Sequence, residues 1–289
     1  MRGLRGIADK MGMCYTSGLN RQNGGAKKMK SDLELVCDLV RECGLFIKDA
    51  DRGHLHVDAK SGRANFVTEY DKQVQERLRV GLREIMPDAH FVGEEGSTQT
   101  FAPVGKYFIV DPIDGTTNFI KDYRFSCVSV ALVVDGATEF GVVYNPYADE
   151  MFCARRNHGA FCNGKRLHVS TETLEDGIVV FGTAPYHEEL KEKTFKLAYA
   201  YFRKAMDVRR SGSAALDLCT IAAGRAELFF ELVLSPWDYA AGGLIVTEAG
   251  GLVSDCDGRP LAYDRPCSVL ARNKAVRPLA LGDATSAFS

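Results

Sequence analysis

The chain has 289 residues, of which 46% are hydrophobic and 26% charged, and its formal net charge is -2. These values are typical of a soluble globular protein with a substantial core, and the small net charge gives no reason to expect nucleic acid or an acidic membrane surface as a general partner. No apolar run approaches the roughly 20 residues that a membrane-spanning helix needs, so no membrane association is expected.

The nine cysteines are odd in number and scattered, and none belongs to a C-x-x-C pair. This pattern argues against a zinc site and against a disulfide framework. We interpret several of them as small core hydrophobes and expect a reducing, cytoplasmic location.

Residues 1–30 differ in composition from the rest of the chain. They carry seven basic residues against one acid, Asp9, and show no sustained helical period. A secretory signal would need an apolar core, which is absent. We therefore predict a basic, disordered or artefactual extension. Met29 is a candidate natural start, because Ser31 and Glu34 just after it have the spacing of a capping box that opens a helix.

Hydrophobic spacing predicts a first helix after Ser31 and a second from about Tyr70 to Ile85. Short strands separated by turn signals are expected next, at 91–92, 107–110, 126–134, 140–144 and 151–154. The later predicted elements are strands at 177–182, 227–231, 251–254 and 268–271, and helices at 188–205, 213–223 and 236–250. We expect an α+β subdomain at 31–169 that contains the main site segment, and an α/β subdomain at 170–289 that completes the site.

The most distinctive segment is DPIDGTTN, residues 111–118, which directly follows the apolar run YFIV. Pro112 disfavours a helical conformation at Asp111, so we predict a tight turn here. Such a turn would bring the side chains of Asp111 and Asp114 to one point. Two carboxylates at one point repel each other unless a cation or a proton lies between them. Hard oxygen ligands favour Mg²⁺ or Mn²⁺ over zinc, so the segment predicts a divalent-cation site.

Three other acids have ordinary explanations when each is taken alone. Glu94 lies between glycines in a predicted turn after a strand, where acids are usually solvated. Asp71 and Asp238 lie near predicted helix starts, where the helix dipole favours an acid. The six histidines show no H-E-x-x-H spacing, and we interpret them as surface or structural residues.

Taken together, three segments resemble the signature of the inositol monophosphatase family: FVGEE at 91–95, DPIDGTTNF at 111–119 and WDYAAG at 237–242. Their order and wide spacing also match, as does GSAAL at 212–216 ahead of Glu231. The resemblance runs from about residue 33 to 271. It implies an α+β fold, a layered α-β-α-β-α sandwich of the inositol monophosphatase and fructose-1,6-bisphosphatase type.

The resemblance also implies two or three Mg²⁺ ions, with Mn²⁺ as a substitute. Glu94, Asp111 and the Ile113 carbonyl would hold a first ion, and Glu94 would hold a weaker third through water. Asp111, Asp114 and Asp238 would hold a second. Asp71 and Thr116 would orient the attacking water, so the implied catalytic residues are Asp71, Glu94 and Thr116. The residues implied to contact the substrate are Lys60, Asp114, Gly115, Thr116, Thr117, Gly212, Ser213, Ala214, Glu231 and Asp238.

The expected reaction is hydrolysis of a phosphate monoester by metal-activated water. Residues 117–119 resemble the inositol branch, and Glu231 suits a polyol because a carboxylate accepts hydrogen bonds from hydroxyls. We therefore expect inositol 1-phosphate, with a fructose-1,6-bisphosphatase or broader sugar-phosphate phosphatase as the alternative. A second alternative is a non-catalytic role with RNA and transcription, although every expected ligand type is present. The family implies lithium sensitivity and a homodimer, and no nucleic-acid partner is expected.

Overall fold

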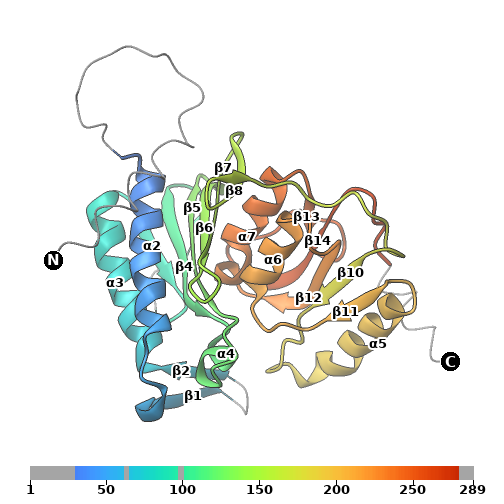
Figure 1. Ribbon diagram of the computed structural model, residues 1–289. Helices are drawn as coiled ribbons and strands as arrows, with labels where there is room; N and C mark the ends of the chain where they lie inside the picture. Colours follow the sequence, from blue (N-terminus) through green and yellow to red (C-terminus); the bar gives the residue numbers. More distant parts are fainter. Residues whose placement is uncertain (1–29, 62–64, 97–100, 280–289) are drawn as a thin grey trace.

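The computed structural model describes residues 30–61, 65–96 and 101–279 (Figure 1). Apart from Lys30, the predicted basic extension lies outside these residues. Within the described part of the chain, no helix is both long enough and apolar enough to cross a membrane.

The predicted α-β-α-β-α layering is confirmed (Figure 1). Helices α2 (Asp32–Lys48) and α3 (Glu69–Ile85) form the first outer layer, on one face of a seven-stranded sheet. Helices α6 (Ala214–Ala222) and α7 (Pro236–Glu248) lie between this sheet and a five-stranded sheet. Helix α5 (Lys191–Phe202) forms the other outer layer.

The larger sheet has the strand order β3-β4-β5-β6-β7-β8-β9, in which β3 and β4 are parallel and the other neighbours are antiparallel. Its strands are β3 (His90–Gly93), β4 (Lys106–Asp114), β5 (Cys127–Val134), β6 (Ala137–Asn145), β7 (Glu150–Arg155), β8 (Gly159–Cys162) and β9 (Lys165–Arg166). The long antiparallel strands are joined by short connections, as expected for hairpins.

The smaller sheet has the order β11-β10-β12-β14-β13. Its strands are β10 (Ile178–Phe181), β11 (Asp207–Arg209), β12 (Leu228–Leu234), β13 (Leu252–Ser254) and β14 (Cys267–Arg272). The remaining elements are η1 (Arg52–His54), β1 (Val57–Ser61), β2 (Asn65–Thr68), α4 (Thr116–Ile120) and η2 (Glu188–Leu190). The proposed boundary at residues 169 and 170 falls between β9 and β10, and the division into subdomains remains a prediction.

Both faces of β4 are buried, which explains its continuous apolar run. Phe108 and Val110 pack in the core beneath α2 and α3, whereas Ile109 packs in the core that contains α6 and α7. Successive side chains of a strand point to opposite faces, so a strand between two helical layers needs apolar residues at every position. The end of β4 is thereby held between two cores.

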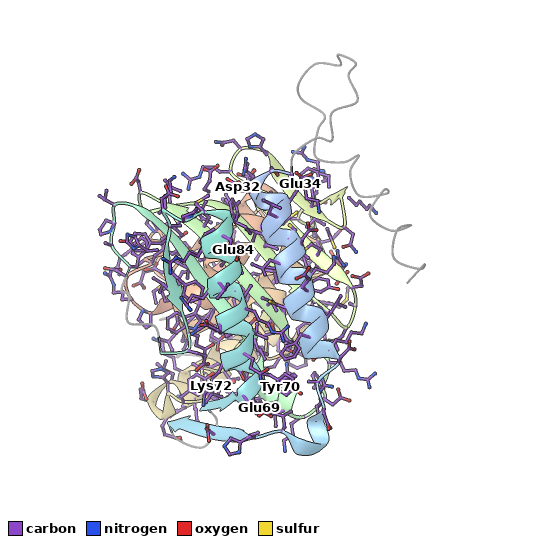
Figure 2. The ribbon with its side chains drawn as sticks, turned by 90° about the vertical axis from the view of Figure 1, so that its left-hand side faces the viewer. Asp32, Glu34, Glu69, Tyr70, Lys72 and Glu84 are labelled. Atoms are coloured by element: carbon purple, nitrogen blue, oxygen red, sulfur yellow. The ribbon has the colours of Figure 1, made fainter. Side chains whose placement is uncertain are left out.

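Capping boxes fix the starts of the two outer helices. Ser31 and Glu34 cap α2, and Thr68 and Asp71 cap α3. Figure 2 looks onto these two helices, whose exposed side chains include Asp32 and Glu84. The predicted start of the first helix after Ser31 is confirmed, as is the second helix, predicted from about Tyr70 to Ile85. A capping box and an amphipathic repeat are local signals that a sequence shows directly.

Most other predicted elements are also confirmed, but several short ones were missed. These are β1, β2, β8, β9, β11 and α4. Helix α5 is shorter than predicted, because residues 188–190 form the separate 3-10 turn η2. Short strands without a strong apolar alternation give little sequence signal, since their pairing partners determine them.

Candidate active site

The end of β4 contains a bulge rather than the predicted tight turn. Pairing with β5 runs to Asp111 opposite Ser129 and resumes at Asp114 opposite Cys127, so β4 has one extra residue there. Pro112 lies within this segment and cannot donate a ladder hydrogen bond, which favours a bulge. The Ile113 N–H instead donates to Asp111 Oδ1 at 3.0 Å, and this contact holds the carboxylate in place.

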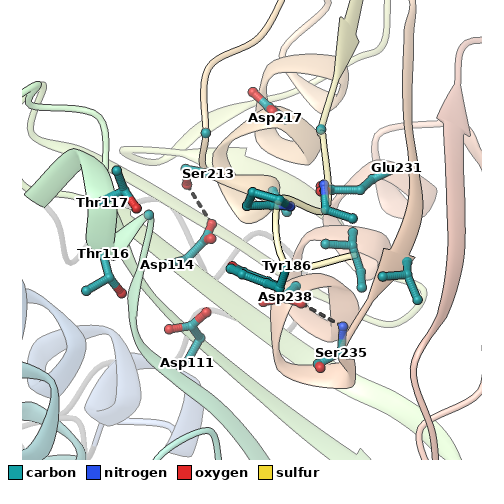
Figure 3. Close-up of a pocket in the computed structure, with 18 of the residues that line it drawn as sticks. Asp111, Asp114, Thr116, Thr117, Tyr186, Ser213, Asp217, Glu231, Ser235 and Asp238 are labelled. Carbon is teal, nitrogen blue, oxygen red and sulfur yellow. Dashed lines mark hydrogen bonds between the residues drawn. The ribbon is translucent and has the colours of Figure 1, made fainter. Parts of the chain in front are cut away.

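Three carboxylates converge at this bulge. Asp111, Asp114 and Asp238 each offer one oxygen, and these oxygens all lie within 4.8 Å of one another. Two come from β4 and the third from the start of α7, and all three face the same pocket (Figure 3). Asp111 is 2% exposed and Asp114 7% exposed, so water screens their mutual repulsion poorly.

Glu94 reaches the same pocket from the neighbouring strand. Because β3 and β4 are parallel and Gly93 pairs with Val110, Glu94 and Asp111 leave the sheet side by side. The Glu94 N–H donates to the Val110 carbonyl at 3.2 Å, which extends this pairing by one residue. The two acids therefore meet at the carboxyl edge of a parallel strand pair, where α/β sheets place ligands.

The electrostatics of the cluster disfavour several negative charges without a cation. Burial raises the pKa of Asp111 well above its usual value, and the charges of Glu94, Asp114 and Asp238 raise it further. Burial and the same kind of repulsion raise the pKa of Asp238. For Asp114, burial raises the pKa to about 6 although hydrogen bonds from Ser213 and Ala215 oppose the shift. An oxygen-only donor set with this repulsion fits a hard divalent cation.

Two of the site's acids are also capping residues. Asp71 Oδ2 accepts hydrogen bonds from the Thr68 N–H at 2.7 Å and from the Thr68 hydroxyl at 2.6 Å. Asp238 Oδ2 accepts from the Ser235 N–H at 2.7 Å at the start of α7. A carboxylate has two oxygens, so a helix cap and a role in the site are compatible rather than competing explanations.

Thr116 connects Asp71 to the bulge. Its hydroxyl lies 3.2 Å from Asp71 Oδ1 and 3.0 Å from the Ile113 carbonyl oxygen. Both neighbours are acceptors and the hydroxyl has one proton, so it donates to only one of them at a time. The contact to fully buried Asp71 therefore places a proton acceptor next to the acid cluster.

Helix α4 begins beside the acids because Gly115 permits a left-handed turn. Its φ is 90°, and a Cβ at this position would lie 3.1 Å from the Phe125 carbonyl oxygen and 3.2 Å from that of Gly212. Only glycine combines this backbone with these close approaches. Thr116 and Thr117 then begin α4 at the edge of the pocket, where the Thr117 side chain is exposed.

The second half of the chain supplies the opposite wall. Ser213 and Ala214 lie at the start of α6, and Glu231 lies in β12; with Gly212 they line the same pocket of about 190 Å³. Glu231 Oε1 accepts a hydrogen bond from the Ala184 N–H at 2.8 Å. Burial raises the pKa of Glu231 to about 7, so the protonated, uncharged form of this side chain persists to a higher pH than in an exposed glutamate.

The structure thus brings together all the predicted site residues except Asp71 and Lys60 in the lining of one pocket, and Asp71 lies directly behind it against Thr116. Lys60 belongs to β1, and its side chain lies outside the described part of the structure. The sequence-based prediction missed eleven lining residues, and four of these have titratable side chains: Tyr186, His187, Arg210 and Asp217. Of these four residues, only Arg210 and Asp217 could have been suspected from the sequence, because they lie on either side of the GSAAL segment.

The chain is similar to several known proteins over most of its length. The profile of the inositol monophosphatase family matches residues 28–287. Inositol monophosphatase 1 of Sus scrofa is 34% identical over 253 residues, which cover 84% of this chain and 90% of that protein. Nus factor SuhB of Escherichia coli strain K12 is 40% identical over 228 residues, or 78% of this chain and 85% of that protein. A solved IMPase/NADP phosphatase complexed with Mg²⁺ and phosphate is similar with a TM-score of 0.75 at 25% identity, covering 84% of this chain and 90% of that one.

Proposed function

The chain belongs to the inositol monophosphatase family, and on that premise we propose that it is a Mg²⁺-dependent phosphatase that hydrolyses inositol 1-phosphate to inositol and phosphate. The observation that carries the proposal is the convergence of Asp111, Asp114 and Asp238, with one oxygen of each within 4.8 Å of the others. Three buried or half-buried carboxylates at one point repel each other unless a cation or a proton lies between them, and phosphate ester hydrolysis is a reaction that a divalent cation serves.

The proposed ligands are those that the resemblance implies. Glu94, Asp111 and the Ile113 carbonyl would hold one ion, and Asp111 with Asp114 and Asp238 would hold another; Mn²⁺ is a proposed substitute. When bound, Mg²⁺ supplies Lewis-acid chemistry that lowers the pKa of water and neutralises phosphoryl charge. Four carboxylates carry four negative charges, which two divalent cations balance. The relative complexed with Mg²⁺ and phosphate supports this choice of ion.

The proposed roles of the chain's own groups follow from their contacts. Thr116, hydrogen bonded to Asp71, would hold the attacking water and pass its proton toward the Asp71 carboxylate. Backbone amides after Gly115 and the Thr117 hydroxyl would hold the phosphate oxygens. No side-chain nucleophile is needed, because positioning and charge neutralisation supply most of the catalysis in phosphoryl transfer.

The alcohol portion of the substrate would lie against the second half of the pocket. Glu231 is 8% exposed, and its position suits an acceptor for the hydroxyls of a polyol. An inositol and a sugar present similar hydroxyls, so fructose 1,6-bisphosphate and other sugar phosphates remain the alternative substrates. Inhibition by Li⁺, a homodimeric state and a cytoplasmic location are further parts of this proposal.

The test is phosphate release from inositol 1-phosphate, fructose 1,6-bisphosphate and 3′-phosphoadenosine 5′-phosphate, with Mg²⁺ and with EDTA. We expect Mg²⁺-dependent release that is fastest with inositol 1-phosphate. Asp114→Asn should nearly abolish it, whereas Asp88→Asn, an exposed acid paired with Lys106, should leave it unchanged. Equal release with EDTA, or full activity of Asp114→Asn, would contradict the proposal.

A second candidate function rests on the 40% identity with a Nus factor. A transcription-associated role would add an RNA or protein partner to the same fold. We would compare the full chain with a form that begins at Met29 in RNA gel shifts at low salt. A salt-sensitive shift of the full chain alone would support the role, and the absence of any shift would dismiss an RNA partner.

A further inference from the structure

The segment that carries Glu94 lies at the edge of the larger sheet. β3 is the first strand in the sheet order, so β4 is its one partner among the described strands. Residues 94–96 form a turn directly after β3. The Glu94 N–H donates to the Val110 carbonyl at 3.2 Å, which is the last contact of this pairing. An edge strand has backbone N–H and C=O groups without a ladder partner, so the turn depends on contacts from outside the sheet.

A side-chain amide of α3 provides such a contact. Gln75 Oε1 accepts a hydrogen bond from the Glu95 N–H at 2.8 Å, and Gln75 Nε2 donates to the Glu95 carbonyl. A neighbouring antiparallel strand would exchange the same two bonds with one residue. The Gln75 side chain therefore takes the place of a strand neighbour at the peptide that follows Glu94.

Gly93 makes room for this amide. A Cβ on Gly93 would lie 2.8 Å from Gln75 Cδ and closer still to Gln75 Oε1, so any larger residue would displace the amide. Gln75 is half-buried, which limits the access of water that could replace its two hydrogen bonds. The contact between Gln75 and Glu95 is thus built into both segments.

The same face of α3 supports the acidic pocket at a second point. Asp71 lies four positions before Gln75, and helix positions i and i+4 are neighbours on one face. Asp71 accepts its contact from Thr116 behind the pocket, whereas Gln75 holds the Glu95 peptide. One helical face is therefore attached to two segments of the site.

Gln75 itself stays outside the acidic pocket. Glu94 lines that pocket, but Gln75 does not. Gln75, Glu95 and Gly96 instead line a separate groove beside α3 and β3. Gln75 therefore acts on the pocket through the peptide next to Glu94 rather than by touching an ion or a substrate.

We propose that Gln75 is a positioning residue, which holds the Glu94 carboxylate at the proposed cation site by fixing the Glu95 peptide. The inference rests on the proposed function and adds to its cation site a residue that is not a ligand. Partners that orient a metal ligand change metal affinity by about 10-fold to 100-fold when they are removed. The expected effect is therefore on the binding of Mg²⁺ rather than on the binding of the phosphate ester.

The experiment measures Mg²⁺ binding to the full chain by titration calorimetry without substrate. Gln75→Met keeps the length of the side chain but removes both hydrogen bonds, and should raise the Mg²⁺ dissociation constant about tenfold. Gln75→Glu keeps an acceptor for the Glu95 N–H but no donor for its carbonyl, so it should recover part of the loss. Gly93→Ala displaces the amide without changing it, and should also weaken Mg²⁺ binding. Should Gln75→Met not fold, these two variants carry the same comparison.

Two further readouts separate positioning from a general loss of stability. In EDTA, Gln75→Met should speed hydrogen exchange in the segment that contains Glu95 and leave exchange in α7 unchanged. In phosphate release from inositol 1-phosphate, the Mg²⁺ concentration that gives half the maximal rate should rise about tenfold. At saturating Mg²⁺, kcat and KM should stay within about twofold of the wild type, because the remaining machinery is intact.

Gln73 provides a matched control on the same helix. It is exposed and lines neither the acidic pocket nor the neighbouring groove, so Gln73→Met should change none of these quantities. A normal Mg²⁺ dissociation constant in Gln75→Met would overturn the inference, as would an equal shift in Gln73→Met. A lower kcat at saturating Mg²⁺ with normal Mg²⁺ binding would overturn it too.

Failure of this inference is distinguishable from failure of the proposed function. A wild type that releases phosphate, beside a Gln75→Met variant that binds Mg²⁺ normally, would overturn only the role of Gln75. A wild type that binds Mg²⁺ but hydrolyses no phosphate ester would refute the proposed function, and the calorimetry and hydrogen exchange would still decide the role of Gln75. A wild type that binds neither Mg²⁺ nor Mn²⁺ would refute both.

Discussion

The Ser213 hydroxyl donates to Asp114 Oδ2 at 2.5 Å and so joins the two halves of the pocket. Asp114 ends β4 of the larger sheet, whereas Ser213 caps α6, which packs between the sheets. The Ala215 N–H donates to the same oxygen at 2.7 Å. The start of α6 therefore fixes one carboxylate of the acid cluster.

Ser213→Ala should lower both stability and activity. It removes the α6 cap and one hydrogen bond to Asp114, which should cost about 1 to 2 kcal/mol of unfolding free energy. The activity should fall because Asp114 loses its orientation, with the larger loss at low pH, since the lost hydrogen bond opposes the rise of its pKa. Urea unfolding and phosphate release measure the two effects.

Ser31→Ala is the control for this prediction. Ser31 caps α2 at the surface and does not line the pocket, so its loss should lower stability by a similar amount and leave activity intact. If both variants lose activity in equal measure, general destabilisation rather than the Asp114 contact is responsible.

Mg²⁺ should raise the melting temperature of the wild type, because a ligand that binds only the folded chain stabilises it. Asp111→Asn should melt at a higher temperature than the wild type in EDTA, since it removes one buried, repelled carboxylate while its amide oxygen can still accept from the Ile113 N–H. The same variant should gain little from Mg²⁺. If saturating Mg²⁺ left the melting temperature of the wild type unchanged, the result would argue against the cation site.

The raised pKa of Glu231 predicts a specific pH dependence in EDTA. Between pH 4.5, the usual value for a glutamate, and about 7, the folded chain binds more protons at Glu231 than the unfolded chain. The unfolding free energy should therefore fall as pH rises through this window. Across this window, the unfolding free energy of the wild type should fall by up to about 3 kcal/mol more than that of Glu231→Gln, at 1.36 kcal/mol for each pKa unit. Parallel curves for the two proteins would show that Glu231 titrates normally.

Gly182→Ala should weaken binding of the alcohol portion. A Cβ at Gly182 would lie 1.8 Å from Glu231 Oε2, so the carboxylate must move. We expect KM for inositol 1-phosphate to rise by about tenfold, with a smaller change in the hydrolysis of p-nitrophenyl phosphate, which lacks the hydroxyls.

The control for this substitution is Gly243→Ala in α7. A Cβ there meets nothing closer than 3.8 Å, and alanine favours a helix by about 1 kcal/mol, so this variant should be as stable as the wild type or more so. An unchanged KM in Gly182→Ala would mean that Glu231 has no part in binding the alcohol.

Local signals predicted much of the fold. The capping pairs at Ser31 and Thr68, the apolar run before Asp111 and the proline at the start of α7 each act over a few residues. By contrast, β11 has three residues and owes its existence to pairing with β10, which the sequence does not encode locally. The sequence predicted a tight turn where β4 has a bulge. Pro112 disfavours a helical conformation at Asp111, and this preference is compatible with both a turn and a bulge.

The candidate site divides in the same way. Asp111 and Asp114 lie three positions apart, so their type and spacing predict a cation site before any fold is known. Other features of the site depend on contacts between residues that are distant in the chain: Asp238 joins these two acids, Ser213 donates to Asp114, and Arg210 donates to Thr183 near Glu231. The sequence by itself determined which chemical groups were present and which short segments would order them. Only the tertiary structure decided which groups meet, because a contact between distant side chains depends on the packing of whole layers and leaves no periodicity along the chain.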